Sequence, residues 1–187
     1  KDKVFNKTKF FPDSKLNYSE NILKKKSDEL AINFLSEKGF EENISWNDLY
    51  VKVCKFSSFL KKLNLQKGDR VAAYVPNKIE SIICFLACAK NGIIWSSCSP
   101  DFGVQGVVDR FKQIKPKVFI TCDYYYYNGK KINILDKVED ILKNIPSIKK
   151  VIAYNYNKKE KENLKDFINF EETLKNDADE VFERFEF

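Results

Sequence analysis

The sequence predicts an α/β protein with a doubly wound, mainly parallel sheet that is flanked by helices. Short apolar segments rich in β-branched and aromatic residues alternate with segments whose apolar residues recur every three or four positions. Short connections separate these segments. Such an alternation forms a parallel sheet, because right-handed crossovers place the helices over its two faces.

The first part of the chain predicts an arm, a short strand and a long helix. Residues 1–30 show little periodicity and are expected to form an irregular arm. A strand is expected at 31–36 and a turn at 39–43. Ser45 lies three residues before Asp48, which is a variant of the capping box, and an apolar stripe follows. A helix is therefore expected to begin after Ser45.

The rest of the chain alternates strands and helices. Asn77 and Glu80 are expected to cap a helix that runs to about residue 90. The expected strands are 70–75, 93–97, 118–121 and 151–154. Further helices are expected at 104–114 and 134–145, a tyrosine-rich loop at 124–128, and a solvated charged loop at 155–163. Four further residues are expected in the core: Trp46, Cys84, Cys88 and Trp95.

Composition limits the possible classes of protein. Of 187 residues, 43% are hydrophobic and 32% are charged, as in a packed domain, and the absence of Met suggests a fragment. No apolar run approaches the roughly 18 to 20 residues of a membrane span, and no signal peptide is visible. Five irregularly spaced Cys favour reduced thiols, and zero His argues against a catalytic triad or a zinc site. A cytoplasmic protein without membrane partners is expected.

The positive charge does not predict a nucleic-acid partner. The net charge of +6 comes from 30 Lys against three Arg, and the Lys are spread along the whole chain. Arg is the preferred bidentate reader of phosphate and guanine. We therefore expect no nucleic-acid binding, although such a module is kept as an alternative.

Ligands of doubly wound sheets bind outside the carboxyl ends of the strands, so function is expected in the loops after Val75, Ser97, Thr121 and Tyr154. The loop at Cys98–Gly103 combines a thiol, a hydroxyl and a carboxylate at the start of a helix, where free amides favour anions. From the residues alone, the favoured interpretation is a capping turn with Ser99 or Asp101 as the cap. The run Tyr124–Lys131 offers aromatic faces and ammonium groups that could stack a base and hold phosphate, or rings that merely cover the sheet edge.

A family resemblance covers nearly the whole chain. The runs that carry it are Trp95–Gly103, Asp109–Val118, Leu16–Asn21, Lys67–Val71 and Tyr127–Lys130. Together they resemble the acetoacetyl-CoA synthetases, a branch of the adenylate-forming acyl-CoA synthetase family. The resemblance implies a ligase that converts ATP, acetoacetate and CoA to acetoacetyl-CoA, AMP and diphosphate through an acyl-adenylate. The whole enzyme would use ATP, CoA and Mg²⁺.

The resemblance also implies how the chain is divided. Residues 1–30 would be the N-terminal arm typical of acetyl- and acetoacetyl-CoA synthetases. Residues 31–187 would be the first α/β part of the AMP-binding domain, truncated before the phosphate loop. The fragment alone is then expected to be inactive, with no catalytic or metal-binding residue, and to need the remainder of its own chain.

The same resemblance implies a wall of the CoA site. The residues that would form it are Ser99, Pro100, Asp101, Tyr126, Asn128 and Lys130. Related enzymes usually have an Arg where this chain has Tyr126, which cannot neutralise a phosphate, so this contact would fall to Lys130 or Lys131. A ligase for acetate, propionate or another short acid is the nearest alternative, because the acid pocket is not expected in this segment.

Overall fold

A five-stranded parallel sheet forms the centre of the molecule. The computed structural model of the chain describes residues 11–160, 164 and 167–186. The strands are hydrogen-bonded in the order β10-β9-β6-β4-β5, and each pair of neighbours is parallel. Their bounds are β4 Arg70–Tyr74, β5 Ile94–Cys98, β6 Val118–Cys122, β9 Lys150–Tyr154 and β10 Ile168–Asn169. The predicted α/β class with a parallel sheet is confirmed.

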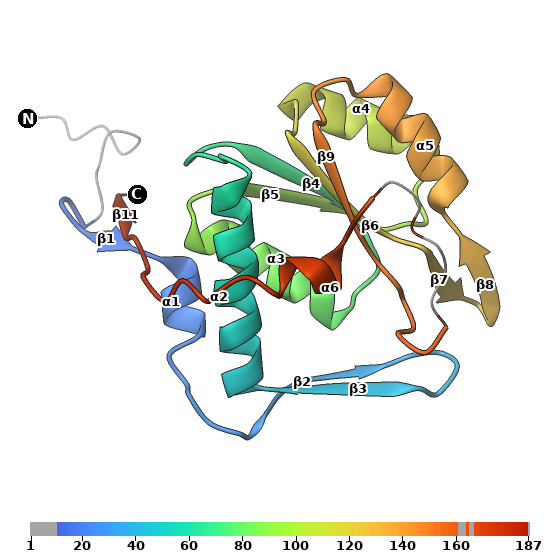
Figure 1. Cartoon of the computed structure of the whole chain (residues 1–187). Coiled ribbons are helices and arrows are strands. Elements are labelled where there is room, and N and C mark those ends of the chain that lie inside the picture. The colour runs from blue at the N-terminus through green and yellow to red at the C-terminus, as the bar shows by residue number, and fades with distance from the viewer. Residues whose placement is uncertain (1–10, 161–163, 165–166, 187) are drawn as a thin grey trace, which may run out of the picture.

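Helices cover both faces of this sheet (Figure 1). Helices α2 and α3 pack together on one face, and α4 and α5 pack together on the other. The helices are α1 Tyr18–Ile22, α2 Trp46–Lys62, α3 Ile79–Lys90, α4 Val104–Ile114, α5 Leu135–Asn144 and α6 Phe170–Thr173. From β4 the chain moves to β5 on one side and then returns to β6 on the other side. The sheet is therefore doubly wound.

Three small antiparallel pairs surround the main sheet. Their strands are β1 Lys15–Leu16 with β11 Phe185–Glu186, β2 Leu30–Leu35 with β3 Glu41–Ser45, and β7 Tyr124–Tyr127 with β8 Lys130–Asn133. Two predictions are wrong here. The expected turn at 39–43 is mostly strand β3, and the expected tyrosine-rich loop is strand β7. Asn128 and Gly129 have φ of 48° and 72°, so they form a tight two-residue turn of the kind that joins adjacent hairpin strands.

The helix starts follow their caps, with one exception. The Ser45 side chain accepts a hydrogen bond from the Asp48 backbone N–H at 3.1 Å, so the predicted cap of α2 is confirmed. The predicted Asn77 cap of α3 is wrong, because Lys78 occupies the cap position and makes no side-chain cap bond. Its ammonium group is instead buried and donates to the Tyr156 carbonyl oxygen at 2.6 Å. The residue at the start of α3 is therefore held by a distant contact that no local pattern encodes.

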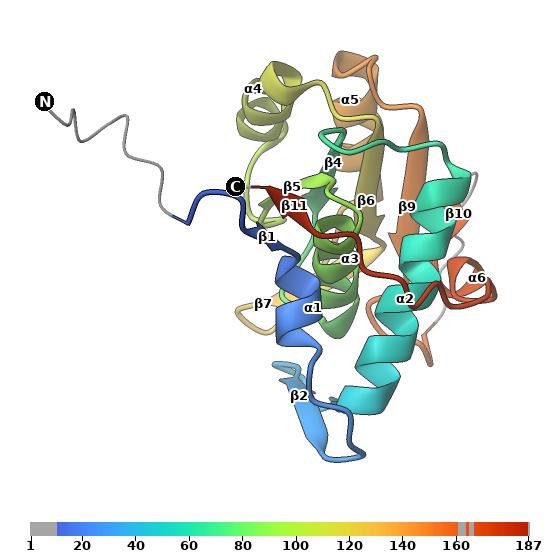
Figure 2. The same ribbon diagram turned by 90° about the vertical axis from the view of Figure 1, so that its left-hand side faces the viewer.

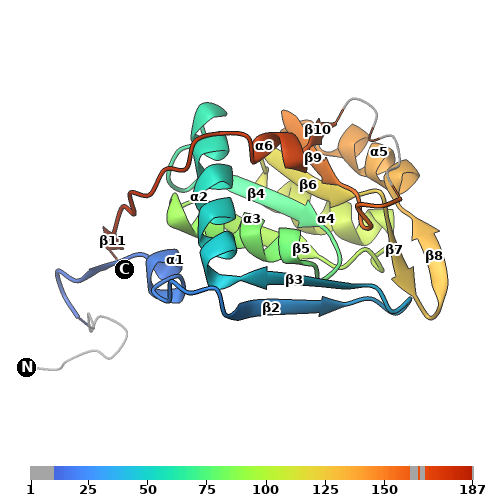
Figure 3. The same ribbon diagram turned by 60° about the horizontal axis from the view of Figure 1, so that its bottom comes forward.

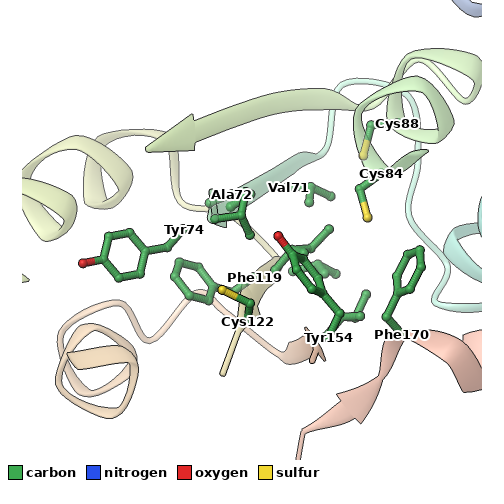
Figure 4. Packing of buried hydrophobic residues seen from close by; sticks show 14 of the residues in the cluster. Val71, Ala72, Tyr74, Cys84, Cys88, Phe119, Cys122, Tyr154 and Phe170 are labelled. Carbon is green, nitrogen blue, oxygen red and sulfur yellow. The ribbon is translucent and has the colours of Figure 1, made fainter. Parts of the chain in front are cut away.

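The core lies on both sides of the two central strands (Figure 4). Val71 of β4 and Phe119 of β6 are fully buried. Cys84 and Cys88 of α3 are also buried, as predicted. Trp46 and Trp95, also predicted as core residues, are only partly buried and pack against it. Trp95 lies on β5, the edge strand of the main sheet, so one side of its ring has no neighbouring strand to cover it.

The two ends of the described chain lie side by side (Figure 2). Strand β1 pairs with β11, and Arg184 donates two hydrogen bonds to the Glu20 carboxylate at 2.8 and 2.7 Å. Asn17 is 2% exposed, and its amide donates to the carbonyl oxygens of Lys90 and Glu183, both at 2.8 Å. Asn17 also caps α1. One buried amide therefore joins the start of the chain, the end of α3 and the last segment.

We expect the Asn17→Ala substitution to lower the free energy of unfolding of the full-length protein by about 2–3 kcal/mol, because it leaves two buried carbonyl oxygens unpaired and removes a helix cap. Chemical denaturation measures the change. Asn47→Ala is the matched control, since the Asn47 amide makes only an exposed hydrogen bond to Asp28. Equal losses for both variants would contradict the role of Asn17.

Candidate functional site

A pocket of about 510 Å³ lies at the carboxyl ends of β4, β5 and β6. We refer to it as the edge pocket. Its walls are Val75, Pro76, Asn77, Ser81, Ile82, Phe85, Trp95, Ser97, Cys98, Ser99, Pro100, Asp101, Tyr125, Tyr126 and Tyr127. The connection from β4 leads to one side of the sheet, and that from β6 leads to the other. The edge pocket therefore lies where a doubly wound sheet binds its ligands.

The loop after β5 is held by a hydrogen-bond network around Asp101. Asp101 Oδ1 accepts from the Tyr125 hydroxyl at 2.8 Å, and Asp101 Oδ2 accepts from the Ser99 hydroxyl at 2.7 Å. Helix α4 is capped by Gly103 without a side-chain bond. The alternative that Ser99 or Asp101 caps this helix is therefore wrong. The two side chains bond to each other and to β7.

Two tyrosines stay protonated in this network. The Tyr74 hydroxyl lies 2.6 Å from the Pro100 carbonyl oxygen and 2.7 Å from that of Phe102. Burial raises the pKa of Tyr74 to about 12. Burial, together with the hydrogen bond to Asp101, also raises the pKa of Tyr125. Both hydroxyls therefore remain donors at neutral pH. Tyr74 holds the loop after β5 through its backbone carbonyl oxygens, and Tyr125 holds it through the Asp101 carboxylate.

The four consecutive tyrosines point in alternating directions. Tyr125 reaches Asp101, and Tyr127, two residues later, also lines the edge pocket and is 57% exposed. Tyr124 and Tyr126 pack against Tyr156, with ring centroids 5.4 and 5.8 Å away. Tyr126 also lines the edge pocket, beside the exposed ring of Tyr127.

Asn128 and Lys130 lie outside the edge pocket, at the far end of the β7–β8 hairpin. Lys130 is exposed, and its ammonium group makes no hydrogen bond or ion pair with any residue that the structure describes. Lys131 is engaged, because its ammonium lies 3.8 Å over the Tyr124 ring and 3.9 Å from the Glu160 carboxylate. The structure therefore gathers Ser99, Pro100, Asp101 and Tyr126 at one pocket and leaves Lys130 as a free cation beyond it.

Sequence reasoning missed the apolar wall of the edge pocket. Ile82 and Phe85 of α3 form it with Trp95, whose ring centroid is 6.4 Å from that of Phe85. The sequence contained a signal for this apolar wall, because α3 is apolar on most sides and one of its faces must pack toward an edge strand. Asn77, a predicted cap, also belongs to this pocket.

The loop after β9 does not line the edge pocket. It was expected to carry function and to be solvated. Residues 158–160 are exposed, as expected, whereas Tyr156 is 4% exposed, and residues 161–163 lie outside the described part of the chain. Lys158 lies 3.1 Å from each of the Glu80 and Glu171 carboxylates. Lys158 and Glu80 border a separate pocket of about 330 Å³ between α3 and β3. The loop binds elements of the protein together.

The described residues contain no group of three or more His, Cys, Asp or Glu arranged to hold a metal ion. They also contain no helix with the length and apolarity needed to cross a membrane.

Comparison with known proteins gives the family. Residues 19–182 match the AMP-binding enzyme family over most of the chain. The chain belongs to this family. It is 43% identical over 146 residues to the acetoacetyl-coenzyme A synthetase of Rhizobium meliloti (strain 1021), covering 78% of this chain and 22% of that protein. It is 38% identical over 150 residues to the malonamoyl-CoA synthetase of Penicillium aethiopicum, covering 77% of this chain and 21% of that one.

A solved structure shows the same fold. The acetoacetyl-CoA synthetase from Streptomyces lividans matches with a TM-score of 0.88 at 32% sequence identity, over 95% of this chain and 28% of that one. The chain thus spans about a fifth of the length of the curated relatives it matches. The resemblance found in the sequence is confirmed, and the chain is a fragment relative to these synthetases.

The cysteines of the chain lie in environments that favour the protonated thiol. All five are free and buried, and burial raises the pKa of every one of these thiols. A raised pKa leaves less thiolate at pH 8 than an ordinary thiol has. We expect iodoacetamide to label them at least about tenfold more slowly than glutathione in the native full-length protein, and at ordinary rates in urea.

Peptide mass spectrometry measures the labelling at each position. Cys98 is the sharpest case, because it also lines the edge pocket. Rapid modification of Cys98 in the native protein would contradict the expected low reactivity.

Proposed function

We propose that the full-length protein is an acetoacetate:CoA ligase. It would form acetoacetyl-adenylate and diphosphate from acetoacetate and ATP, and then transfer the acyl group to the CoA thiol with release of AMP. One observation carries the proposal: the Ser97–Gly103 loop, whose sequence first suggested the acetoacetyl branch, borders a pocket at the switch point of the sheet in an AMP-binding enzyme. Acetoacetyl-CoA synthetases are among its relatives at about 40% identity.

We propose that this segment forms part of the wall that receives CoA. The donor set of the edge pocket suits the parts of CoA. Trp95 and Tyr127 offer faces for an adenine ring, and Ser97 and Ser99 offer hydroxyls. Lys130 offers a charge without a fixed geometry for a phosphate. The proposed CoA-binding residues remain Ser99, Pro100, Asp101, Tyr126, Asn128 and Lys130, to which Tyr127 is added.

Asp101 would not contact a phosphate. Its carboxylate is negative and already accepts from Ser99 and Tyr125. Remaining lone pairs can accept from an N–H or O–H group of the ligand. The neutral parts of CoA would therefore lie by Asp101 and the anionic parts toward Lys130. In this division residues 31–187 form the first α/β part of the AMP-binding domain, and ATP and Mg²⁺ are held chiefly by other parts of the protein.

The five free thiols support a reducing compartment, for which the cytoplasm is our proposal. The acid substrate rests on the family branch alone. Malonamoyl-CoA synthetase is nearly as similar to this chain as the acetoacetyl-CoA synthetases are, so the segment does not distinguish between such acids. A ligase for another short acid is the alternative.

Substrate choice can be measured directly. We expect the purified full-length enzyme to use acetoacetate with a kcat/KM at least about tenfold above that for acetate, since a site built for the keto group gains contacts that acetate cannot make. Propionate and malonamate extend the panel. A preference for any of these three acids would reject the acetoacetate assignment while keeping the ligase class.

Lys130 tests the CoA wall. Replacing Lys130 with Ala in the full-length enzyme should raise the KM for CoA by about ten- to a hundredfold, because one charge-assisted contact is lost. Adenylate formation, measured by pyrophosphate exchange, should stay nearly unchanged. Lys143→Ala is the matched control, because Lys143 is an exposed lysine of α5 that pairs with Asp140. An equal effect on both half-reactions would reject the role of Lys130.

A further inference from the structure

The tip of the β2–β3 hairpin contacts the turn of the β7–β8 hairpin (Figure 3). Glu37 Oε1 accepts from the Asn128 backbone N–H at 3.3 Å, and Glu37 Oε2 accepts from the Gly129 backbone N–H at 2.9 Å. These residues lie 91 and 92 positions apart in the sequence. One carboxylate thus holds both central amides of the turn that precedes Lys130.

The turn depends on this outside contact. The hairpin ladder pairs only four residues of each strand, from Tyr124 with Asn133 to Tyr127 with Lys130, so the two turn amides lie beyond it. A two-stranded hairpin of this length is marginally stable alone in water. Because the acceptor is ionised, its bonds to the amides are stronger than those to a neutral group. Glu37 therefore supplies order that the hairpin cannot supply itself.

In addition to the hydrogen bonds of Glu37, aromatic contacts align the two hairpins. The rings of Phe34 and Phe40 lie 5.9 and 5.6 Å from that of Tyr156, which also contacts Tyr126. The Lys38 ammonium lies 5.7 Å from the Tyr126 ring centroid. These contacts fix the distance between the hairpins, so that the Glu37 carboxylate meets the turn.

We propose that Glu37 is a positioning residue for CoA binding. It holds the Asn128–Gly129 turn, and the turn fixes where strand β8 begins and hence where Lys130 presents its ammonium. This inference rests on the proposed function and deepens it. Glu37 touches no ligand itself, and its carboxylate is turned to the turn amides.

The charge of Glu37 gives a competing expectation of opposite sign. A carboxylate near Lys130 repels phosphates, so if repulsion were dominant, removing the charge would tighten CoA binding. If positioning is dominant, removing the carboxylate loosens the turn and weakens CoA binding. A Gln at this position separates the two effects, because it keeps an oxygen acceptor and loses the charge.

The experiment uses the full-length protein with Glu37→Ala, Glu37→Gln and the control Glu41→Ala, which removes another exposed carboxylate of the same hairpin. We expect Glu37→Ala to speed hydrogen exchange in the peptide 124–133 by about tenfold and to raise the KM for CoA by roughly three- to tenfold. Adenylate formation should stay unchanged. Glu37→Gln should recover part of the loss, because its one oxygen can accept from one turn amide while its NH2 group cannot accept from the other. Glu41→Ala should change neither readout.

Each other outcome overturns part of the proposal. If hydrogen exchange is unchanged in Glu37→Ala, Glu37 does not hold the turn. If exchange is faster but the KM for CoA is unchanged, Glu37 holds the turn but has no role in CoA binding. A lower KM for CoA in both Glu37 variants shows that repulsion dominates and rejects positioning. If the wild-type protein forms no acyl-CoA, the proposed function is rejected together with this role, while the exchange rates still decide whether Glu37 holds the turn.

Discussion

Strand β4 is the element on which the candidate site depends. It pairs with β5 on one side and with β6 on the other in a common register, so that Tyr74 lies opposite both Cys98 and Thr121. Parallel strands in such a register end together, and the loops that follow them leave the sheet at one edge. The Tyr74 hydroxyl then reaches the Pro100 carbonyl oxygen, so the strand that aligns the sheet also fixes the loop after β5.

Local signals in the sequence were sufficient for most of this frame. The Ser45 cap depends on residues three positions apart, and helix α4 was predicted with the bounds 104–114 that it has. The loops at the carboxyl ends follow from strand direction alone, which explains why the loop at Cys98–Gly103 could be placed at this edge of the sheet. The same argument also selected the loop after β9, which borders a different pocket.

The predictions from sequence failed where the residue pattern was uniform or where the contacting residue was distant in the sequence. Four identical tyrosines carry no alternation of polar and apolar residues, so strand β7 read as a loop, although Asn128-Gly129 is a strong hairpin signal. Lys78 could not be predicted as a buried helix cap, because its acceptors are Glu42 and the Tyr156 carbonyl oxygen. The contact of Glu37 with the turn likewise joins residues that only the folded sheet brings together.

Two buried lysines show how this chain uses charge. Lys78 joins α3 to the β2–β3 hairpin through Glu42, and Lys90 joins α3 to the last segment through Asp179 and the Val181 carbonyl oxygen. Burial lowers the pKa of Lys90, while the charge of Asp179 opposes this shift. Removing one partner from such a buried pair leaves an uncompensated charge, which is strongly destabilising. Neither lysine lines the edge pocket. These two buried lysines therefore join elements of the protein, whereas Lys130, to which we assign a CoA phosphate in our proposal, is exposed.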